Sequence, residues 1–432
     1  MRTIFMSESC QRDHFLSMTF SGQKLPLING FVADVNEEDI KNIEAKGYLA
    51  FRDEKNVHIP TPIQEVYAAE QWPSTECNPE YKQPMRQMVD SGVEKLIKKG
   101  FIGSGVHIGV ADTGVDASHP DIISRMVGFR DFVERDNTNP KDPHGHGTAV
   151  VGVAAGSGAI ISKFHGVAPG AKYSHARVLD VNGSGYTSDI IEGLQWLSSC
   201  GCQIINLSLG SMSPQWTPVS TAVQNLCKQG ILVIVAAGND GPCVQIEAPA
   251  NADDCVTVVG CNAAGEYCEF SCIGPAINEN EEENSDKPDI MAWGRNIVAP
   301  LSSQAVSKGF DISGSYRVMN GTSFACPFIS GCAALYIEAV GDIKNFKKHI
   351  KETAFDSQEY IYFQEGCGRV NIYSAIAVGL GVEEIPPKDN IDNSQDDCVP
   401  DPIIEDTSKN KGCFGLVWPF WSLFFAVNSF FS

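Results

Sequence analysis

Short apolar runs bounded by polar and glycine-rich turns recur through the middle of the chain. Three of them have the length of a buried strand: residues 106–111, 203–207 and 231–237. Helical periodicity covers 187–197, and the segments 149–155 and 324–340 are apolar around nearly the whole helical circumference, as in helices buried in a core. Strands that alternate with helices are typical of an α/β fold.

Polar side chains with catalytic potential stand where these elements begin or end. Asp112 directly follows the first strand, and the carboxyl ends of parallel strands are where α/β sheets place functional groups. His146 precedes the first apolar helix. Ser323 precedes the second, where the helix dipole favours developing negative charge. Such residues can supply an orienting group, a base and a nucleophile.

Neighbouring residues compete for two of these roles. His144 competes with His146, but only His146 stands directly before the Gly-Thr pair at the helix start. Asp116 and Asp121 compete with Asp112, but both lie in the loop beyond the strand. We therefore favour Asp112 and His146.

The segment around Ser323 also fits a helix cap without a catalytic role. Gly321 and Thr322 predict a tight turn with a capping side chain. Pro327 is expected in the first turn, where few backbone donors are lost. Only the presence of the aspartate and the histidine elsewhere in the chain favours a nucleophile.

Residues 91–380 resemble the subtilisin-like serine proteases. The resemblance is carried by three motifs in order: Asp112-Thr113-Gly114, Gly145-His146-Gly147-Thr148 and Gly321-Thr322-Ser323. It implies a three-layer subtilisin-like α/β fold, with a mainly parallel central sheet and helices on both faces, and a serine endopeptidase that forms an acyl-enzyme. Ser323 would be the nucleophile, His146 the general base and then acid, and Asp112 the group that orients the imidazole. The alternative is a catalytically silent subtilase-like binding or scaffold module at a membrane.

The same resemblance implies further site residues. Asn239, after the strand 231–237, matches the asparagine of the oxyanion hole, although an Asn-Asp-Gly turn is the default interpretation of that tripeptide. The walls of a cleft for polypeptide substrates would be Gly183, Ser184, Gly185, Ser208, Leu209 and Gly210. Glu247, Asp253 and Asp254 lie near the expected first pocket; they are either solvated loop acids or the source of a preference for a basic residue before the scissile bond.

No cofactor is required for this chemistry. Many members of the family bind structural calcium, and Asp121 matches one carboxylate of such a site. The loop 156–165 holds no asparagine or aspartate to complete an oxygen-rich site. Calcium at that position is therefore doubtful, and the sequence identifies no metal ligands.

Residues 1–60 resemble an inhibitory propeptide, a small α+β module that would make the chain a zymogen and act as its inhibitor. Its later part is visible from residue 28 onward, whereas its first strand and helix are not evident in residues 1–25. A shortened or divergent propeptide is expected; the alternative is an amphipathic extension without inhibitory function. The proline-containing segment 61–90 is expected to be a linker.

The C-terminal end changes composition twice. Residues 381–411 are acidic and predict a linker, whereas 412–432 form a hydrophobic tail rich in phenylalanine and tryptophan. Membrane association through this tail is favoured, as a span or an interfacial anchor. A removable anchor-addition signal and a strip packed on the catalytic domain are the alternatives.

The net charge and the cysteine content limit the possible partners and the cellular compartment of the protein. A formal net charge of −21 argues against nucleic-acid binding, because phosphates would be repelled. Residues 1–20 show no continuous apolar run of a signal peptide, and the 15 cysteines leave at least one thiol unpaired within a monomer. The propeptide-like module and the tail favour a secreted or cell-surface protein, which the tail could anchor in the membrane. An intracellular protein is the alternative.

Overall fold

The computed structural model describes residues 1–7, 21–59, 85–306, 311–312 and 314–388, which belong to one compact unit. The predicted tail at 412–432 and most of the two predicted linkers lie outside the described residues. The end of the first linker is not an extended connection, because residues Arg86–Asp90 form the short helix α3.

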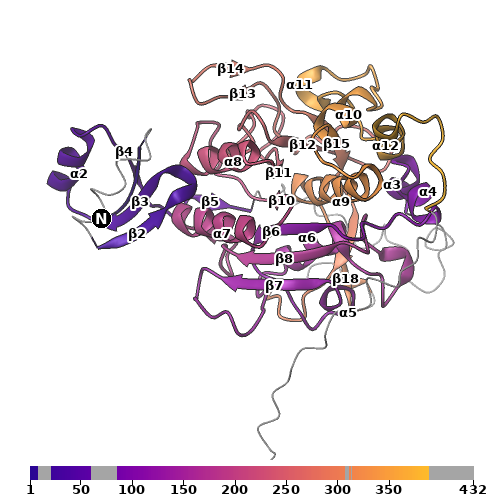
Figure 1. The fold of residues 1–432 in the computed structure, drawn as a ribbon, viewed down its shortest axis with the longest axis horizontal. Coiled ribbons are helices and arrows are strands. Elements are labelled where there is room, and N and C mark those ends of the chain that lie inside the picture. Colours follow the sequence, from indigo (N-terminus) through magenta and orange to yellow (C-terminus); the bar gives the residue numbers. More distant parts are fainter. Residues whose placement is uncertain (8–20, 60–84, 307–310, 313, 389–432) are drawn as a thin grey trace, which may run out of the picture. The chain divides into compact units, whose positions relative to one another are not determined.

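A seven-stranded parallel sheet forms the centre of the larger part of this unit (Figure 1). Its strands, in spatial order, are β15 (Ile290–Trp293), β12 (Val256–Cys261), β11 (Leu232–Ala236), β10 (Ile204–Leu207), β6 (His107–Asp112), β8 (Lys172–Arg177) and β7 (Met126–Asp131). The three strands predicted from apolar runs are confirmed as β6, β10 and β11. They are neighbours in the middle of the sheet, which explains why their sequences are apolar on both faces.

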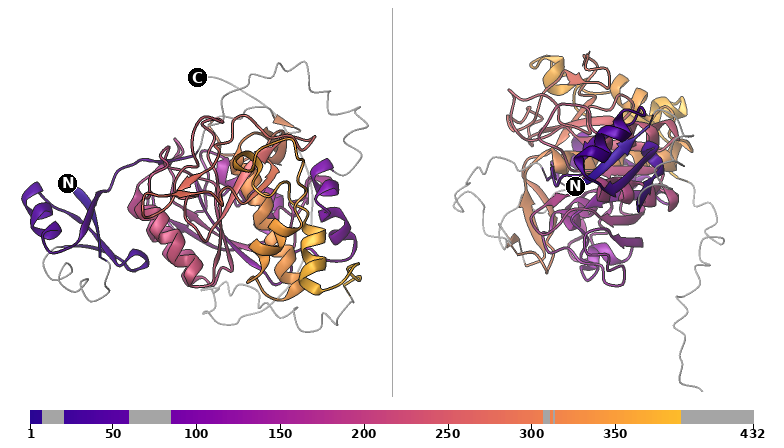
Figure 2. Two further views of the ribbon diagram at one scale, coloured as in Figure 1. Left: turned by 90° about the horizontal axis from the view of Figure 1, so that it is seen from above. Right: turned by 90° about the vertical axis from the view of Figure 1, so that its left-hand side faces the viewer.

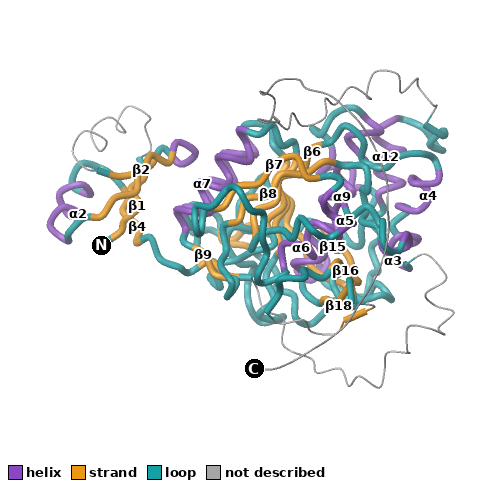
Figure 3. The backbone as a smooth tube through the Cα atoms, turned by 90° about the horizontal axis from the view of Figure 1, so that it is seen from below, coloured by secondary structure: helices purple, strands orange, loops and turns teal. Residues whose placement is uncertain are grey.

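Helices cover both faces of this sheet (Figure 3). The helices α6 (His146–Ala155) and α9 (Thr322–Val340) pack against each other on one face, and α7 (Thr187–Ser199) and α8 (Pro218–Lys228) on the other. The predicted three-layer α/β fold is therefore confirmed. Among the described residues, α9 has the length and apolar composition to cross a membrane, but most of it is buried as the core helix of this unit.

Smaller elements surround the three layers. The other helices are α4 (Val93–Lys98), α5 (Pro120–Ile123), α10 (Phe346–Glu352), α11 (Tyr362–Glu365), α12 (Ile372–Leu380) and the 3-10 turn η5 (Ser162–Phe164). Strands β16 (Ile297–Pro300), β18 (Tyr316–Met319) and β17 (Asp311–Ile312) form one antiparallel sheet, and β13 (Ala276–Ile277) pairs with β14 (Glu283–Asn284). Figure 2 shows α12 beside α4, so segments from the two ends of this part pack together.

The N-terminal residues form a small α+β module with a core of its own. Its antiparallel sheet has the order β2 (Gly22–Leu25), β3 (Gly30–Asp34), β1 (Arg2–Met6) and β4 (Leu49–Arg52), with the turn η2 (Pro26–Ile28) and the helix α2 (Glu37–Glu44). Phe5 and Phe31 are paired across β1 and β3 and are buried. The expectation that residues 1–25 lack a first strand is therefore wrong. Strand β1 is too short for an alternation of apolar and polar residues to reveal it in the sequence. It is recognised by its pairing with β3 and β4.

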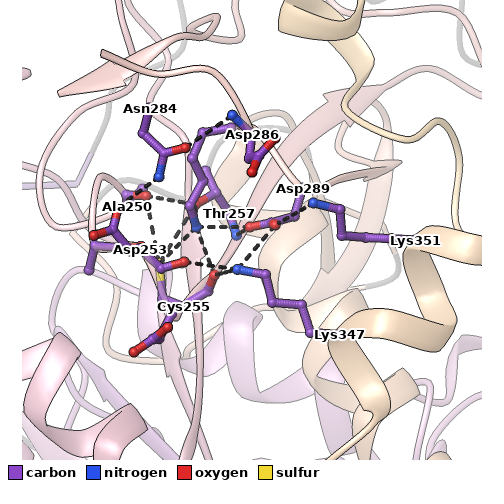
Figure 4. A network of polar contacts seen from close by, with 12 residues as sticks. Ala250, Asp253, Cys255, Thr257, Asn284, Asp286, Asp289, Lys347 and Lys351 are labelled. Carbon is purple, nitrogen blue, oxygen red and sulfur yellow. Dashed lines mark hydrogen bonds and ion pairs between the residues drawn. The ribbon is translucent and has the colours of Figure 1, made fainter. Parts of the chain in front are cut away.

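A buried ion pair joins the start of β15 to the helix α10. The Nζ atom of Lys287 lies 2.8 Å from Oδ2 of Asp289, and both side chains are 1% exposed. Lys347 and Lys351 reach Oδ1 of Asp289 at 3.2 Å and 3.3 Å (Figure 4). Burial alone would raise the pKa of Asp289, but these three ammonium groups hold it well below its usual range. The ionised carboxylate therefore stabilises the folded state.

We predict that Asp289→Ala lowers the free energy of unfolding at pH 7 by about 3–5 kcal/mol, because it leaves Lys287 buried without a counter-charge. The folded pKa of Asp289 is depressed, so its contribution is present above the unfolded pKa of about 3.9 and is lost as the pH falls below it. Urea unfolding followed by circular dichroism measures both effects. Asp286→Ala is the control, since that side chain is exposed. Equal losses in the two variants would contradict the prediction.

Candidate active site

Asp112 and His146 form a buried hydrogen-bonded pair. Asp112 is the last residue of β6, and His146 is the first residue of α6, which starts after Gly145 in a left-handed conformation. Nδ1 of His146 lies 2.8 Å from Oδ1 and 3.0 Å from Oδ2 of Asp112. The carboxylate thus holds one ring nitrogen, and the other nitrogen, Nε2, is left for a further partner.

The surroundings of Asp112 keep its carboxyl group ionised. Burial would raise its pKa, but the charge of His146 and the hydrogen bond from its ring lower it, as does the backbone N–H of Thr113 at 2.7 Å. The net pKa lies below the usual value. An ionised carboxylate next to Nδ1 favours the tautomer with the proton on Nδ1, and it would stabilise an imidazolium.

Ser323 lies close to this pair at the N-terminus of α9. Its Oγ atom donates to the backbone oxygen of Ser208 at 3.4 Å, and the ring of the next residue, Phe324, lies 5.5 Å from the ring of His146. Nε2 of His146 is buried and forms no hydrogen bond with any residue that the structure describes. The structure therefore places Ser323 directly before the residue whose ring packs on His146, and Asp112, His146 and Ser323 each lie at the end of a different element.

Two expectations about the start of α9 are wrong. Thr322 is the first helical residue and not its cap; the cap is Gly321, with φ of 138° and no side-chain hydrogen bond. Pro327 falls in the second turn of the helix. A proline there leaves the carbonyl oxygen of Ser323 without its helical donor, but the hydroxyl of Ser208 donates to that oxygen at 2.8 Å.

Asn239 anchors the same helix start from the loop after β11. Its Oδ1 atom accepts from the backbone N–H of Thr322 at 2.8 Å and from the Thr322 hydroxyl at 2.9 Å. An added Cβ on Gly321 would lie 3.0 Å from Nδ2 of Asn239, so the close approach requires glycine. The orientation of the Asn239 amide beside Ser323 is thus fixed by hydrogen bonds, as a donor to an oxyanion requires.

The competing residues have other partners. Burial and the neighbouring His146 lower the pKa of His144 to about 4, and the Asp112 hydrogen bond belongs to His146. Asp116 accepts from Ser118 and Ser303.

Asp121, the residue matched to a calcium ligand, is also occupied by protein donors. Its two oxygens accept from the backbone N–H of Ile160 at 3.0 Å and from the hydroxyl of Tyr316 at 2.6 Å. Among the described residues, no group of three or more His, Cys, Asp or Glu side chains is arranged to hold a metal ion.

Two buried residues that support the site were not identified from the sequence. The first is Asp142, whose fully buried carboxylate accepts from the hydroxyl of Thr113, the N–H of Gly145, and both the N–H and the hydroxyl of Thr148. It therefore connects the end of β6 to the start of α6. No sequence pattern distinguishes it from a solvated loop aspartate, because the signal is its burial.

The second is Asn206 in β10, whose side chain hydrogen-bonds to residues of α9 and to Ser208. Its amide nitrogen donates to the Ser208 hydroxyl at 3.0 Å, and its Oδ1 accepts from Ser330 at 2.9 Å and from the thiol of Cys326 at 3.2 Å. This chain of bonds orients the Ser208 hydroxyl toward Ser323. Asn206 interrupts an apolar run, which was the available sign of its role.

The two predicted cleft walls flank a segment of the same chain. Strand β5 (Val57–His58) pairs with β9 (Ser184–Gly185). The backbone of His58 exchanges hydrogen bonds of 2.8 Å and 2.9 Å with Gly210, and the N–H of Ile59 donates to the oxygen of Gly183 at 2.9 Å. Residues 57–59 thus form the middle strand between walls 183–185 and 208–210, in the arrangement of a peptide bound by β-augmentation.

Comparisons with known proteins agree with this geometry. The subtilase family model matches residues 103–370, which include every candidate catalytic residue. The chain is 33% identical over 318 residues to serine protease AprX of Bacillus subtilis (strain 168), covering 66% of this chain and 70% of the relative. It is 32% identical over 285 residues to subtilisin of Bacillus pumilus, covering 65% of this chain and 94% of the relative.

We predict that Asp142→Ala destabilises the protein by about 3 kcal/mol or more, because buried N–H and hydroxyl donors lose their acceptor. Asp136→Ala is the matched control, since Asp136 is only partly buried and its side chain accepts only from Thr138 in its own turn. Thermal unfolding of both variants measures the difference. If Asp142→Ala unfolds at the temperature of the control, the carboxylate does not hold the helix start.

Proposed function

This chain belongs to the subtilase family and is a serine-type endopeptidase, and we propose that Asp112, His146 and Ser323 are its catalytic triad. The observation that carries the proposal is the bond from Nδ1 of His146 to Asp112, formed beside a serine at the start of a buried helix. All three residues lie within the part of the chain that matches the family. Its substrates are polypeptides.

The proposed reaction uses each residue as its geometry allows. Nε2 of His146 takes the proton of the Ser323 hydroxyl as Oγ attacks the scissile carbonyl carbon. Asp112 holds the proton on Nδ1 and stabilises the imidazolium, which then protonates the leaving amine. Water, deprotonated by the same nitrogen, hydrolyses the resulting ester on Ser323. The catalytically silent alternative gains no support, because these functional groups lie together.

Asn239 is proposed to stabilise the oxyanion. Its amide is held at Thr322, one residue before Ser323, and the N-terminus of α9 adds backbone N–H groups and the positive end of the helix dipole.

We predict that Asn239→Ala lowers kcat on a peptide substrate by roughly 100- to 1000-fold, whereas Ser323→Ala removes acyl-enzyme catalysis. The size of the loss is the one known for removal of a single oxyanion donor in subtilisin, a member of the same family. Steady-state hydrolysis of a chromogenic peptide gives both values, with thermal unfolding as the check on folding. A folded Asn239→Ala enzyme within twofold of the wild-type kcat would contradict the assignment.

We also propose that the N-terminal module inhibits the enzyme until it is removed, so that the chain is a zymogen. Residues 57–59 already make the backbone bonds that a substrate would make with Gly183 and Gly210. Further contacts hold the module in place: the Ser188 hydroxyl in α7 donates to Asp53 and accepts from Arg2.

We predict that His58→Pro raises the initial rate of peptide hydrolysis by the freshly purified full chain, because proline lacks the N–H that donates to Gly210. His58→Ala keeps that N–H and loses only the side-chain contact to Ser184, so a much smaller change is expected. The lag before full activity measures the release. Identical lags in the wild type and in His58→Pro would exclude this segment as the block.

A secreted or cell-surface location, with membrane association through 412–432, remains a proposal based on the propeptide-like module and the tail. The described cysteines are free thiols, which favours the intracellular alternative. Fractionation of cells that produce the full chain separates the two locations.

A further inference from the structure

Glu247 is a buried acid that the reaction above does not use. The residue is 1% exposed, and its backbone N–H donates to the oxygen of Ala237. Oε1 accepts a long bond of 3.8 Å from the thiol of Cys272. Oε2 is buried and has no hydrogen-bond partner among the described residues. A buried carboxylate oxygen without a partner costs free energy, so its retention suggests a ligand.

The carboxyl group lies against two glycines of the cleft. A Cβ added to Gly210 would lie 2.2 Å from Oε2, and one added to Gly238 would lie 2.7 Å from Oε1. Gly210 is the wall residue that exchanges backbone bonds with His58, and Gly238 directly precedes Asn239. The acid therefore lies between the wall that binds the peptide backbone and the loop that holds the oxyanion donor.

The direction of the bound strand shows which substrate residue would meet this acid. Residues 57–59 run antiparallel to 208–210, so a bound peptide that continued in this direction would run along the wall toward Ser208. The backbone oxygen of Ser208 accepts from Oγ of Ser323. A substrate bound in this direction would place its acyl-side residue at the nucleophile, beside Gly210, Gly238 and the carboxyl group of Glu247.

The charge around Glu247 favours a cation beside its carboxyl group. The ionisable side chains that face it are Asp240 and Cys272, and neither can supply a positive charge. Burial and repulsion from Asp240 raise the pKa of Glu247 to about 7, whereas hydrogen bonds from the backbone of Met212 and from Cys272 lower it. The other acids predicted near this pocket have partners elsewhere: Asp253 accepts from Asn284 and Asp254 from Gln224.

We propose that Glu247 is a specificity-determining residue that selects lysine or arginine immediately before the scissile bond. The inference rests on the proposed function, because that function assigns Ser323 as the nucleophile and so defines which substrate residue lies beside Glu247. A lysine ammonium or an arginine guanidinium that reached the carboxyl group beside these two glycines would pair with Oε2 in a desolvated site, where such pairs are strongest. A neutral apolar side chain would leave Oε2 without a partner.

The test is a cleavage profile of the full chain, taken after its rate of peptide hydrolysis has become constant, on matched peptides with lysine, arginine, leucine or phenylalanine before the scissile bond. We expect higher kcat/KM for the basic residues. Glu247→Gln should lower the ratio of lysine to leucine cleavage by about 100-fold, the loss for removing one partner of a desolvated charge pair. Glu266→Gln makes the same chemical change at an exposed turn and should leave that ratio unchanged.

The outcomes separate this inference from the proposed function. A wild type that cleaves after leucine or phenylalanine without a basic preference, or a Glu247→Gln profile equal to that of the wild type, overturns the role of Glu247 and leaves the triad intact. A wild type that hydrolyses none of the peptides contradicts the proposed function. If Glu247→Gln does not fold, Glu247→Asp replaces it: the basic preference should persist with a higher KM, and its loss would overturn the proposal.

Discussion

The buried N-terminus of α9 is the constraint on which the site depends. A helix that starts inside the core must find partners for backbone groups that water would otherwise satisfy. Here Asn239 accepts from the N–H of Thr322, and Ser208 donates to the carbonyl oxygen that Pro327 leaves unpaired. These two bonds attach the helix to the loops after β11 and β10. The same loops carry Asn239, the proposed oxyanion donor, and one wall of the proposed cleft. The packing of this helix start therefore positions Ser323, Asn239 and that wall relative to one another.

The parts predicted correctly from the sequence are those whose signal is local. The strands β6, β10 and β11 and the helices α6 and α9 are apolar because they are buried, and Asp112 and His146 stand at their ends. The order of the three motifs then implied the family. The parts that could not be predicted depend on contacts between distant segments. Asp142 resembles any loop aspartate until the donors of Thr113 and Thr148 surround it. Pro327 was expected one turn too early, because the start of α9 is set by Asn239, which lies far away in the chain.

The walls of the cleft form main-chain hydrogen bonds, and one buried acidic side chain, Glu247, lies against them. The walls bind residues 57–59 through main-chain bonds, which do not discriminate between sequences. Selectivity must therefore come from side-chain pockets, and Glu247 is the buried charge that lies against the wall next to the nucleophile. Residues 57–59 of the N-terminal module occupy the same walls, so the proposed inhibition and substrate recognition would share one surface.

The central claim is that His146 activates Ser323, and covalent labelling tests it most directly. The full chain, once the rate of peptide hydrolysis is constant, is treated with a fluorophosphonate and analysed by peptide mass spectrometry. The account predicts one label per chain, on Ser323, and a labelling rate that falls by orders of magnitude in His146→Ala. A folded wild type that remains unlabelled at Ser323, or a His146→Ala variant labelled as fast as the wild type, would contradict it.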